Sequence, residues 1–440
     1  MQRTSIVFIA LSALLVTACG GNNDAKPTAR VAVTSDQPTF VDDRSTYSSE
    51  GYVFDALPAH LIDQPVTIAI MLPLSGNNAP LGEAMLNAAT MALIDAYDER
   101  LTLLPFDTKG TYAGAAAAAI AVVDANVDVV LGPLFGASME AAGPIINDAG
   151  LLLIGFSSDS AVARYDRFTM GFTLENEVDR VLSYSVDQGH TRFAALLPEG
   201  VYGRRAGSTF GDIIEQNFVE LTAQEFYPPD ASLVFDPTAR LANYAVRKKA
   251  MDNELSALRA IETDMTDDIA DELEKQEVIG EPDFTAVLIP EGGDLLRTIA
   301  PLLPFYEVDP LKVQFLGTGL WNDPSLMNEP PLHGGWFAAP DPNEPNAFFE
   351  RYRSSFMSPA PRIATIAYDA TALAAHLARN PIVEERFTSE ALLAAEGFKG
   401  IDGLFRFKRN GLAERGLAII EISRGGFNVI DAAPTTFSRF

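Results

Sequence analysis

The chain has 440 residues, more than one domain usually holds, and its apolar content is ample for two hydrophobic cores. Its net charge of −27 offers no basic surface to a phosphate backbone, so we expect no nucleic-acid partner. The only cysteine, Cys19, excludes disulfides within the chain and metal sites built from clustered cysteines.

The N-terminus predicts an export signal followed by a lipid attachment site. Gln2 and Arg3 precede the apolar segment 6–16, which is too short to remain as a membrane-spanning helix, and small residues lead up to Cys19. These residues resemble the bacterial lipobox, which implies a lipoprotein signal peptide over 1–18 and a lipid on Cys19. Gly20 follows the cysteine, so the resemblance implies anchoring to the outer membrane on its periplasmic side. Residues 19–62 have the polar composition of a solvated tether.

Beyond the tether, apolar strands alternate with amphipathic helices. This alternation predicts parallel βαβ units and a doubly wound α/β sheet, in which ligands gather at the carboxyl ends of the strands. The predicted strands are 66–74, 101–108, 127–134 and 151–158, and the predicted helices are 81–97, 113–125 and 138–150.

The loops after these strands do not indicate an enzyme. The first loop, which contains Ser75, lacks both glycine-rich phosphate-binding patterns, so nucleotide binding is disfavoured. Residues 155–159 approach the nucleophile elbow of hydrolases, but Asp159 replaces its second glycine and no histidine stands in a motif that marks a base. The four histidines are scattered and show no metal-ligand spacing, so we expect no catalytic residue, metal or cofactor.

Four segments together resemble the leucine/isoleucine/valine-binding family of type 1 periplasmic binding proteins. They are "IAIMLPLSGNNAPLGEAMLNAATMAL", "VVLGPLFGASMEAAGPIINDAGLLLIGFSSDS", "IATIAYDATALAA" and "GIDGLFRFKRNGLAERGLAIIEI". The resemblance implies two doubly wound lobes, joined by three hinge crossovers near 171–172, 337–339 and 400–403. One lobe would comprise 65–172 plus 340–400, and the other 173–339 plus 401–435.

The same resemblance implies a ligand cleft between the lobes, with hydroxyl groups near helix N-termini that hold an anionic group. The expected cleft residues are Ser75, Ser138, Ser157, Ser158, Tyr202 and Trp321. Each serine has the alternative role of an ordinary helix cap, and Ser75 fits that role best. Amino-acid-binding members carry a carboxylate for the ligand ammonium where this chain has residues 318–321, "TGLW", which leaves Asp159, Glu199 and Glu291 as substitutes.

A long charged stretch follows "FDPTARLANYAVRKKAM", and with the later "LGTGLWNDPSL" it resembles the LppC-type lipoproteins that activate penicillin-binding proteins. The stretch 238–279 contains neither Gly nor Pro, and its apolar residues recur at steps of three and four. We expect a helical insertion, divided near Thr263 or Thr266, whose apolar stripe packs on the second lobe. Its acidic face is either a plain solvated surface or a docking surface for a basic partner.

Two functions are therefore open, neither of them enzymatic. The first is a lipid-anchored activator of penicillin-binding proteins in peptidoglycan synthesis, which the missing ammonium partner and the outer-membrane signal favour. The alternative is the substrate-binding subunit of an ABC importer for amino acids or similar small solutes, with an ABC permease as its partner. A small-molecule ligand fits either function.

Overall fold

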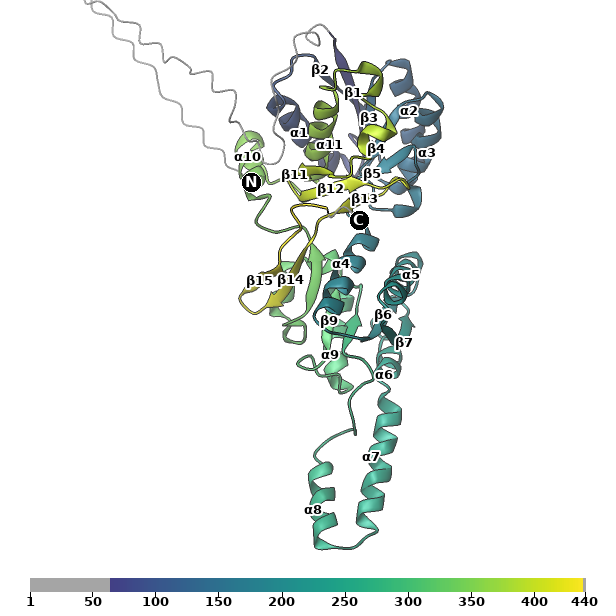
Figure 1. Ribbon diagram of the computed structural model, residues 1–440, viewed down its shortest axis with the longest axis vertical. Helices are drawn as coiled ribbons and strands as arrows, with labels where there is room; N and C mark the ends of the chain where they lie inside the picture. The colour runs from purple at the N-terminus through teal and green to yellow at the C-terminus, as the bar shows by residue number, and fades with distance from the viewer. Residues whose placement is uncertain (1–63, 438–440) are drawn as a thin grey trace, which may run out of the picture. The chain divides into compact units, whose positions relative to one another are not determined.

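The computed structural model describes residues 64–437 (Figure 1). The predicted signal peptide, the predicted tether and Cys19, the predicted lipid attachment site, lie outside the described residues.

The first lobe is built on a five-stranded parallel sheet in the order β2-β1-β3-β4-β5. Along β1, Ile68, Ile70 and Leu72 face one core cluster, whereas Ala69 and Met71 face another on the opposite side of the sheet. Apolar side chains on both faces are what a sheet covered by helices on both sides requires. The predicted alternation is confirmed, with the bounds β1 Val66–Leu72, α1 Ala79–Asp95, β2 Leu101–Asp107, α2 Tyr112–Asp124, β3 Val129–Leu131, α3 Gly136–Asp148, β4 Leu152–Gly155 and β5 Arg167–Thr169.

A later part of the chain returns to complete this lobe. It contributes α10 Asn346–Phe356, α11 Ala364–Leu377, α12 Ser389–Leu392 and a three-stranded sheet of β11 Phe398–Gly400, β12 Gly403–Phe407 and β13 Ala413–Arg415. Phe398, Phe405 and Phe407 are buried in the same cluster as the side chains of β1 and α11. Residues 401–415 therefore belong to the first lobe, which differs from the predicted crossover at 400–403. That glycine-rich turn instead closes a β-hairpin, in which Gly400 pairs with Gly403.

The second lobe has a seven-stranded sheet in the order β15-β14-β10-β9-β8-β6-β7. The strands β6 to β10 are parallel, whereas β14 pairs antiparallel with β10 and β15 pairs antiparallel with β14 at that edge. Core clusters again cover both faces. The elements are α4 Leu174–Asp187, β6 Arg192–Pro198, α5 Val201–Gln216, β7 Glu220–Tyr227, α6 Phe235–Leu241, β8 Ala286–Leu288, α9 Gly293–Phe305, β9 Gln314–Gly317, β10 Trp336–Ala339, β14 Ala418–Ser423 and β15 Gly426–Asp431.

Three crossovers connect the lobes, at 170–173, 340–345 and 416–417. The first and third are linked by Arg415, whose guanidinium donates to the Met170 carbonyl and lies 4.5 Å from the ring centroid of Phe172. Arg362 lies over the same ring at 5.7 Å. Phe172 thus stacks with two arginines at the hinge, an arrangement in which cation–π attraction adds to packing.

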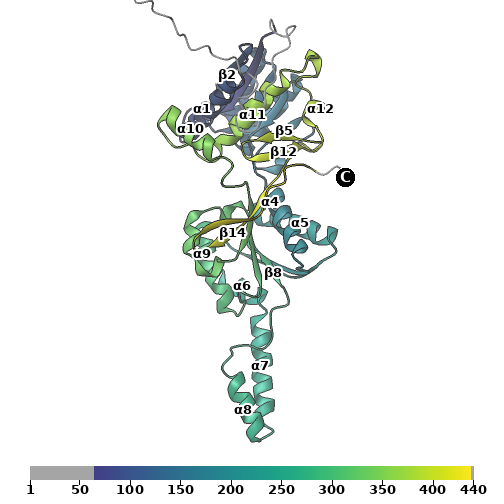
Figure 2. The same ribbon diagram turned by 60° about the vertical axis from the view of Figure 1, so that its left-hand side comes forward.

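The predicted insertion forms a helical hairpin of α7 Tyr244–Arg259 and α8 Asp264–Leu273, which extends away from the second lobe's sheet (Figures 1 and 2). Thr263 is the N-cap of α8 and forms a capping box with Thr266, so the predicted division is confirmed. The predicted packing of the apolar stripe on the lobe is wrong, because Ile261, Met265 and Ile269 remain 58, 71 and 49% exposed.

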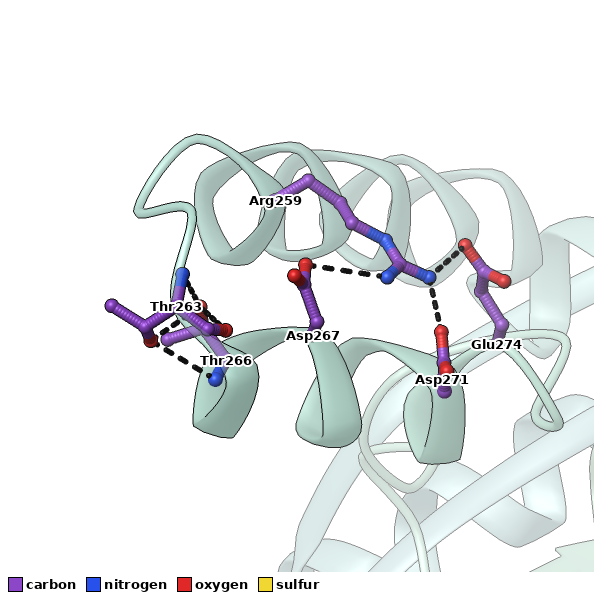
Figure 3. Close-up of polar contacts among 6 residues, drawn as sticks. All are labelled: Arg259, Thr263, Thr266, Asp267, Asp271 and Glu274. Carbon is purple, nitrogen blue, oxygen red and sulfur yellow. Dashed lines mark hydrogen bonds and ion pairs between the residues drawn. The ribbon is translucent and has the colours of Figure 1, made fainter.

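Ion pairs help to hold the two helices together (Figure 3). Arg259 at the end of α7 pairs with Asp267, Asp271 and Glu274, at 3.4, 2.5 and 3.2 Å. Part of the predicted acidic face is therefore engaged within the hairpin.

Candidate functional site

A cavity of about 520 Å³ lies between the lobes, at the carboxyl ends of their parallel strands. Its wall comes from the loop after β4, the first two crossovers, α4, the start of α5, the loop after β9 and the start of α11. Its size is within the usual range for small-molecule sites. The polar side chains of the lining are Ser158, Asp159, Glu177, Tyr202, Arg205, Asn322 and Arg362.

Asp159 follows β4 in the first lobe and makes a polar bridge to the second lobe. Its Oδ1 accepts hydrogen bonds from the Ala161 N–H at 3.1 Å and from Arg205 Nη2 at 2.8 Å. Arg205 comes from α5, and its Nε lies 3.6 Å from Glu175 Oε1 on α4. Ser160 donates to the same Glu175 oxygen at 2.5 Å. Side chains of both lobes therefore meet at the cavity.

Arg362 approaches the cavity from the residues that precede α11. Its Nη1 lies 2.5 Å from Oδ1 of the fully buried Asp402, whose Oδ2 accepts a hydrogen bond from Thr365 at 2.5 Å. Asp369 lies nearby on α11 and accepts from the Ile401 N–H at 2.8 Å. Burial and the charge of Asp402 raise the pKa of Asp369 to about 7.

Glu177, in the first turns of α4, is a carboxylate that the sequence did not single out. Its Oε2 accepts a hydrogen bond of 2.9 Å from the Gly319 N–H, in the loop after β9. Burial, with a smaller contribution from the charge of Glu175, raises its pKa to about 7. Glu177 thus reaches the loop in which amino-acid-binding relatives were expected to carry their carboxylate. Within the described part of the chain, no ion pair neutralises it.

Of the six predicted cleft residues, the structure brings three to the cavities. Ser158 and Tyr202 line the large one, and the Tyr202 hydroxyl lies 3.2 Å from Thr318 Oγ1. Ser157 and Ser158 line an adjoining cavity of about 260 Å³. Asp159 belongs to the lining of both cavities.

The other three predicted residues lie elsewhere. Ser75 donates to Asp107 Oδ2 at 2.6 Å, in the loop between β1 and α1. Ser138 is buried in the first turn of α3, with a hydroxyl that finds no partner among the described residues. Trp321 is fully buried against Gly317, where a Cβ would stand only 2.0 Å from its indole. Its neighbours Gly319 and Leu320 line the cavity instead.

The three acidic substitutes also differ in their placement. Asp159 lies in the cavity wall but is paired with Arg205. Glu291 accepts a hydrogen bond of 2.9 Å from the Tyr227 hydroxyl. Glu199 is an exposed residue between β6 and α5. The cavity lining contains two carboxylates, Asp159 and Glu177, and of these Glu177 has no cationic partner among the described residues.

Within residues 64–437, no cluster of three or more His, Cys, Asp or Glu side chains has an arrangement suited to a metal ion. In the same range, no helix combines the length and the apolar character needed to cross a membrane.

Residues 65–244 match the family model described as "Periplasmic binding protein". A curated relative, an uncharacterised protein of Rickettsia prowazekii, is 26% identical over 182 residues, which are 41% of this chain and 48% of the relative. The match thus spans about half the length of that relative.

Solved structures match over most of the chain. A proposed branched-chain amino acid ABC transporter from Rhodospirillum rubrum is 19% identical, with a TM-score of 0.63, over 83% of this chain and 100% of its own. The fold is that of type 1 periplasmic binding proteins. An ABC transporter substrate-binding protein from Sphaerobacter thermophilus matches with 16% identity and a TM-score of 0.57, over 85 and 98% of the two chains. A solute-binding protein from R. palustris, solved with benzoate, matches with 15% identity and a TM-score of 0.52, over the same shares. At these identities, the similarity supports a shared fold but does not identify a ligand. The ligand class has to be inferred from the chemistry of the cavity.

Proposed function

We propose that the protein binds a small solute in the cleft between its lobes and presents it to an ABC permease. The observation that carries this proposal is the cavity of about 520 Å³, which residues of both lobes line at the ends of their parallel strands. The names of the structural relatives, an ABC transporter and an ABC transporter substrate-binding protein, support the same function. The predicted amino-acid-sized solute suits a cavity of this size.

The fold provides a physical means of capture. Each lobe presents half of the lining, so a solute that contacts both lobes stabilises the closed arrangement over an open one. The three crossovers are the points about which closure occurs. We further propose that the protein works in the periplasm and carries a lipid on Cys19. Attachment to the outer membrane through this lipid would favour the second function, which is described below.

Isothermal titration calorimetry of the full-length protein with a panel of amino acids, amines and aromatic acids tests solute binding. Leu320→Trp should abolish any binding observed, because Leu320 lines the cavity and the larger side chain would fill it. Leu311→Trp is the matched control, at a leucine that is 92% exposed and outside the lining. Failure of the whole panel to bind, or equal binding by both variants, would contradict the proposal.

A second function, activation of penicillin-binding proteins, is favoured by the α7–α8 hairpin. Holding a solute does not require this hairpin, yet it exposes Ile261, Met265 and Ile269 together with acidic residues. We propose it as the contact surface for such an enzyme. The test is the polymerisation rate of a purified penicillin-binding protein with the full-length protein added. The wild type should raise the rate and Met265→Asp should not, whereas no stimulation by the wild type would contradict this function.

A further inference from the structure

The first observation is that the protein places its own carboxylate at the N-terminus of α3. A Cβ on Gly136, the first residue of α3, would stand 3.0 Å from Asp159 Oδ2 and 3.2 Å from the Asp159 Cβ. The preceding residue, Phe135, provides no side-chain cap to the helix. Free N–H groups and the helix dipole favour a negative charge at this end. Asp159 therefore occupies the place where a carboxylate of a bound solute would be best stabilised.

The second observation is that both arginines of the cavity already have carboxylate partners. Arg205 reaches across from the second lobe to Asp159 at 2.8 Å, with Glu175 also at 3.6 Å. Arg362 is paired with Asp402 at 2.5 Å. An incoming carboxylate would have to displace Asp159 from Arg205, or share Arg362 with Asp402 through Nη2, which has no partner among the described residues. In either case it would meet the negative charge of the internal carboxylate. The cavity thus offers an anion little net attraction.

The third observation is that Glu177 has no partner of opposite charge, whereas both arginines have one. Only one of its oxygens accepts a hydrogen bond, from the Gly319 N–H, and the charge that acts on it from nearby is the negative charge of Glu175. A half-buried carboxylate without a counter-charge is unfavourable, and an ammonium group from a ligand would reduce that cost. The adjoining walls are apolar, from Phe156, Phe172, Leu174, Leu320, Ile363 and Ile366.

We propose that the cleft selects a small apolar amine without a carboxylate group, with Glu177 binding the ammonium and Asp159, held by Arg205, excluding a ligand carboxylate. The inference rests on the proposed solute-binding function and names its ligand class. Asp159 and Glu177 are the specificity-determining residues, and they come from opposite lobes. The ligand's apolar body lies against the aromatic and aliphatic wall.

Three compounds of similar size separate the possibilities in calorimetry on the full-length protein: 2-phenylethylamine, phenylalanine and 3-phenylpropanoate. The amine should bind at least about tenfold more tightly than either carboxylate, as expected for one charge-assisted contact. Phenylalanine or 3-phenylpropanoate binding as tightly as the amine would overturn the inference and leave solute binding intact. Failure of these compounds and of the wider panel would overturn both proposals.

Substitutions test the roles of Glu177 in binding the ammonium and of Asp159 in excluding a carboxylate. Glu177→Gln should weaken amine binding about tenfold or more, whereas the control Glu199→Gln, an exposed carboxylate near the same rim, should leave it unchanged. Asp159→Asn should increase the affinity for 3-phenylpropanoate, because the N-terminus of α3 and Arg205 become available to it. An unchanged amine affinity in Glu177→Gln would overturn the assignment. Should a variant fail to fold, the three-compound comparison on the unmodified protein still decides.

Discussion

The α7–α8 hairpin depends on Arg247, a buried arginine on α7 whose replacement should release the hairpin from the second lobe. Its Nη2 donates to the carbonyls of Gly280 and Glu307 at 2.8 and 3.2 Å, and its Nη1 donates to those of Ala242 and Tyr306 at 3.3 and 3.5 Å. One side chain thus joins the start of α7, the segment that follows the hairpin and the end of α9.

The cost of Arg247→Met follows from these bonds. The two shorter bonds from a cation contribute about 1.5 kcal/mol each, and the longer pair contributes less. The methionine regains part of this through apolar burial, so we expect a loss of about 2 to 3 kcal/mol. Since the bonds break when the hairpin detaches, local opening should become about 30-fold to 150-fold more frequent.

Limited digestion with a glutamyl endopeptidase measures this opening, because the hairpin contains several glutamates and the substitution changes none of them. Arg247→Met should be cleaved in the hairpin about thirtyfold faster or more, in line with the expected opening. Lys249→Met is the matched control, since it removes a neighbouring positive charge that is exposed. Equal cleavage rates in the two variants would refute the role assigned to Arg247.

Three further predictions concern other parts of the chain. The pKa of Asp369 is raised from 3.8 to about 7, so the folded state retains a proton that the unfolded state has lost, and stability falls as pH rises through this range. Asp369→Asn should therefore flatten the decline in Tm between pH 5 and 8. An unchanged slope of Tm against pH would contradict this prediction. The buried Trp321 should be protected from iodide quenching in a Trp336→Phe variant, whereas strong quenching would show it exposed. Cys19→Ser should yield an unlipidated protein absent from the outer-membrane fraction, and its retention there would contradict the lipid anchor.

The first lobe could be predicted from sequence because its elements carry strong local patterns. A strand such as 66–72 is apolar on both faces, and the helices between the strands are long and periodic. The third crossover could not be predicted from local patterns, since Gly400 and Gly403 are equally compatible with a hinge and with a hairpin turn. Only the pairing of β11 with β12 distinguishes the two, and that pairing is a tertiary feature.

The site was predicted only in part for a related reason. Ser157, Ser158 and Tyr202 lie just after strands, a position that sequence alone can identify. In the sequence, Glu177 resembles an ordinary acidic residue of a helix N-terminus. The segment "LENEVDR" has the pattern expected for the first turns of a helix. The role of Glu177 emerges from the contact with Gly319, 142 residues further along the chain. Helical periodicity likewise predicted the hairpin but could not say which neighbour its apolar stripe would meet.

The return of the last strands to the second lobe limits when the molecule can fold during its synthesis. The small sheet of the first lobe ends at Arg415, and β14 and β15 over 418–431 complete the second. A nascent chain that stops short of residue 418 leaves the edge of β10 unpaired, and an open edge invites association with other chains. Neither lobe can therefore be finished until nearly the whole polypeptide has emerged.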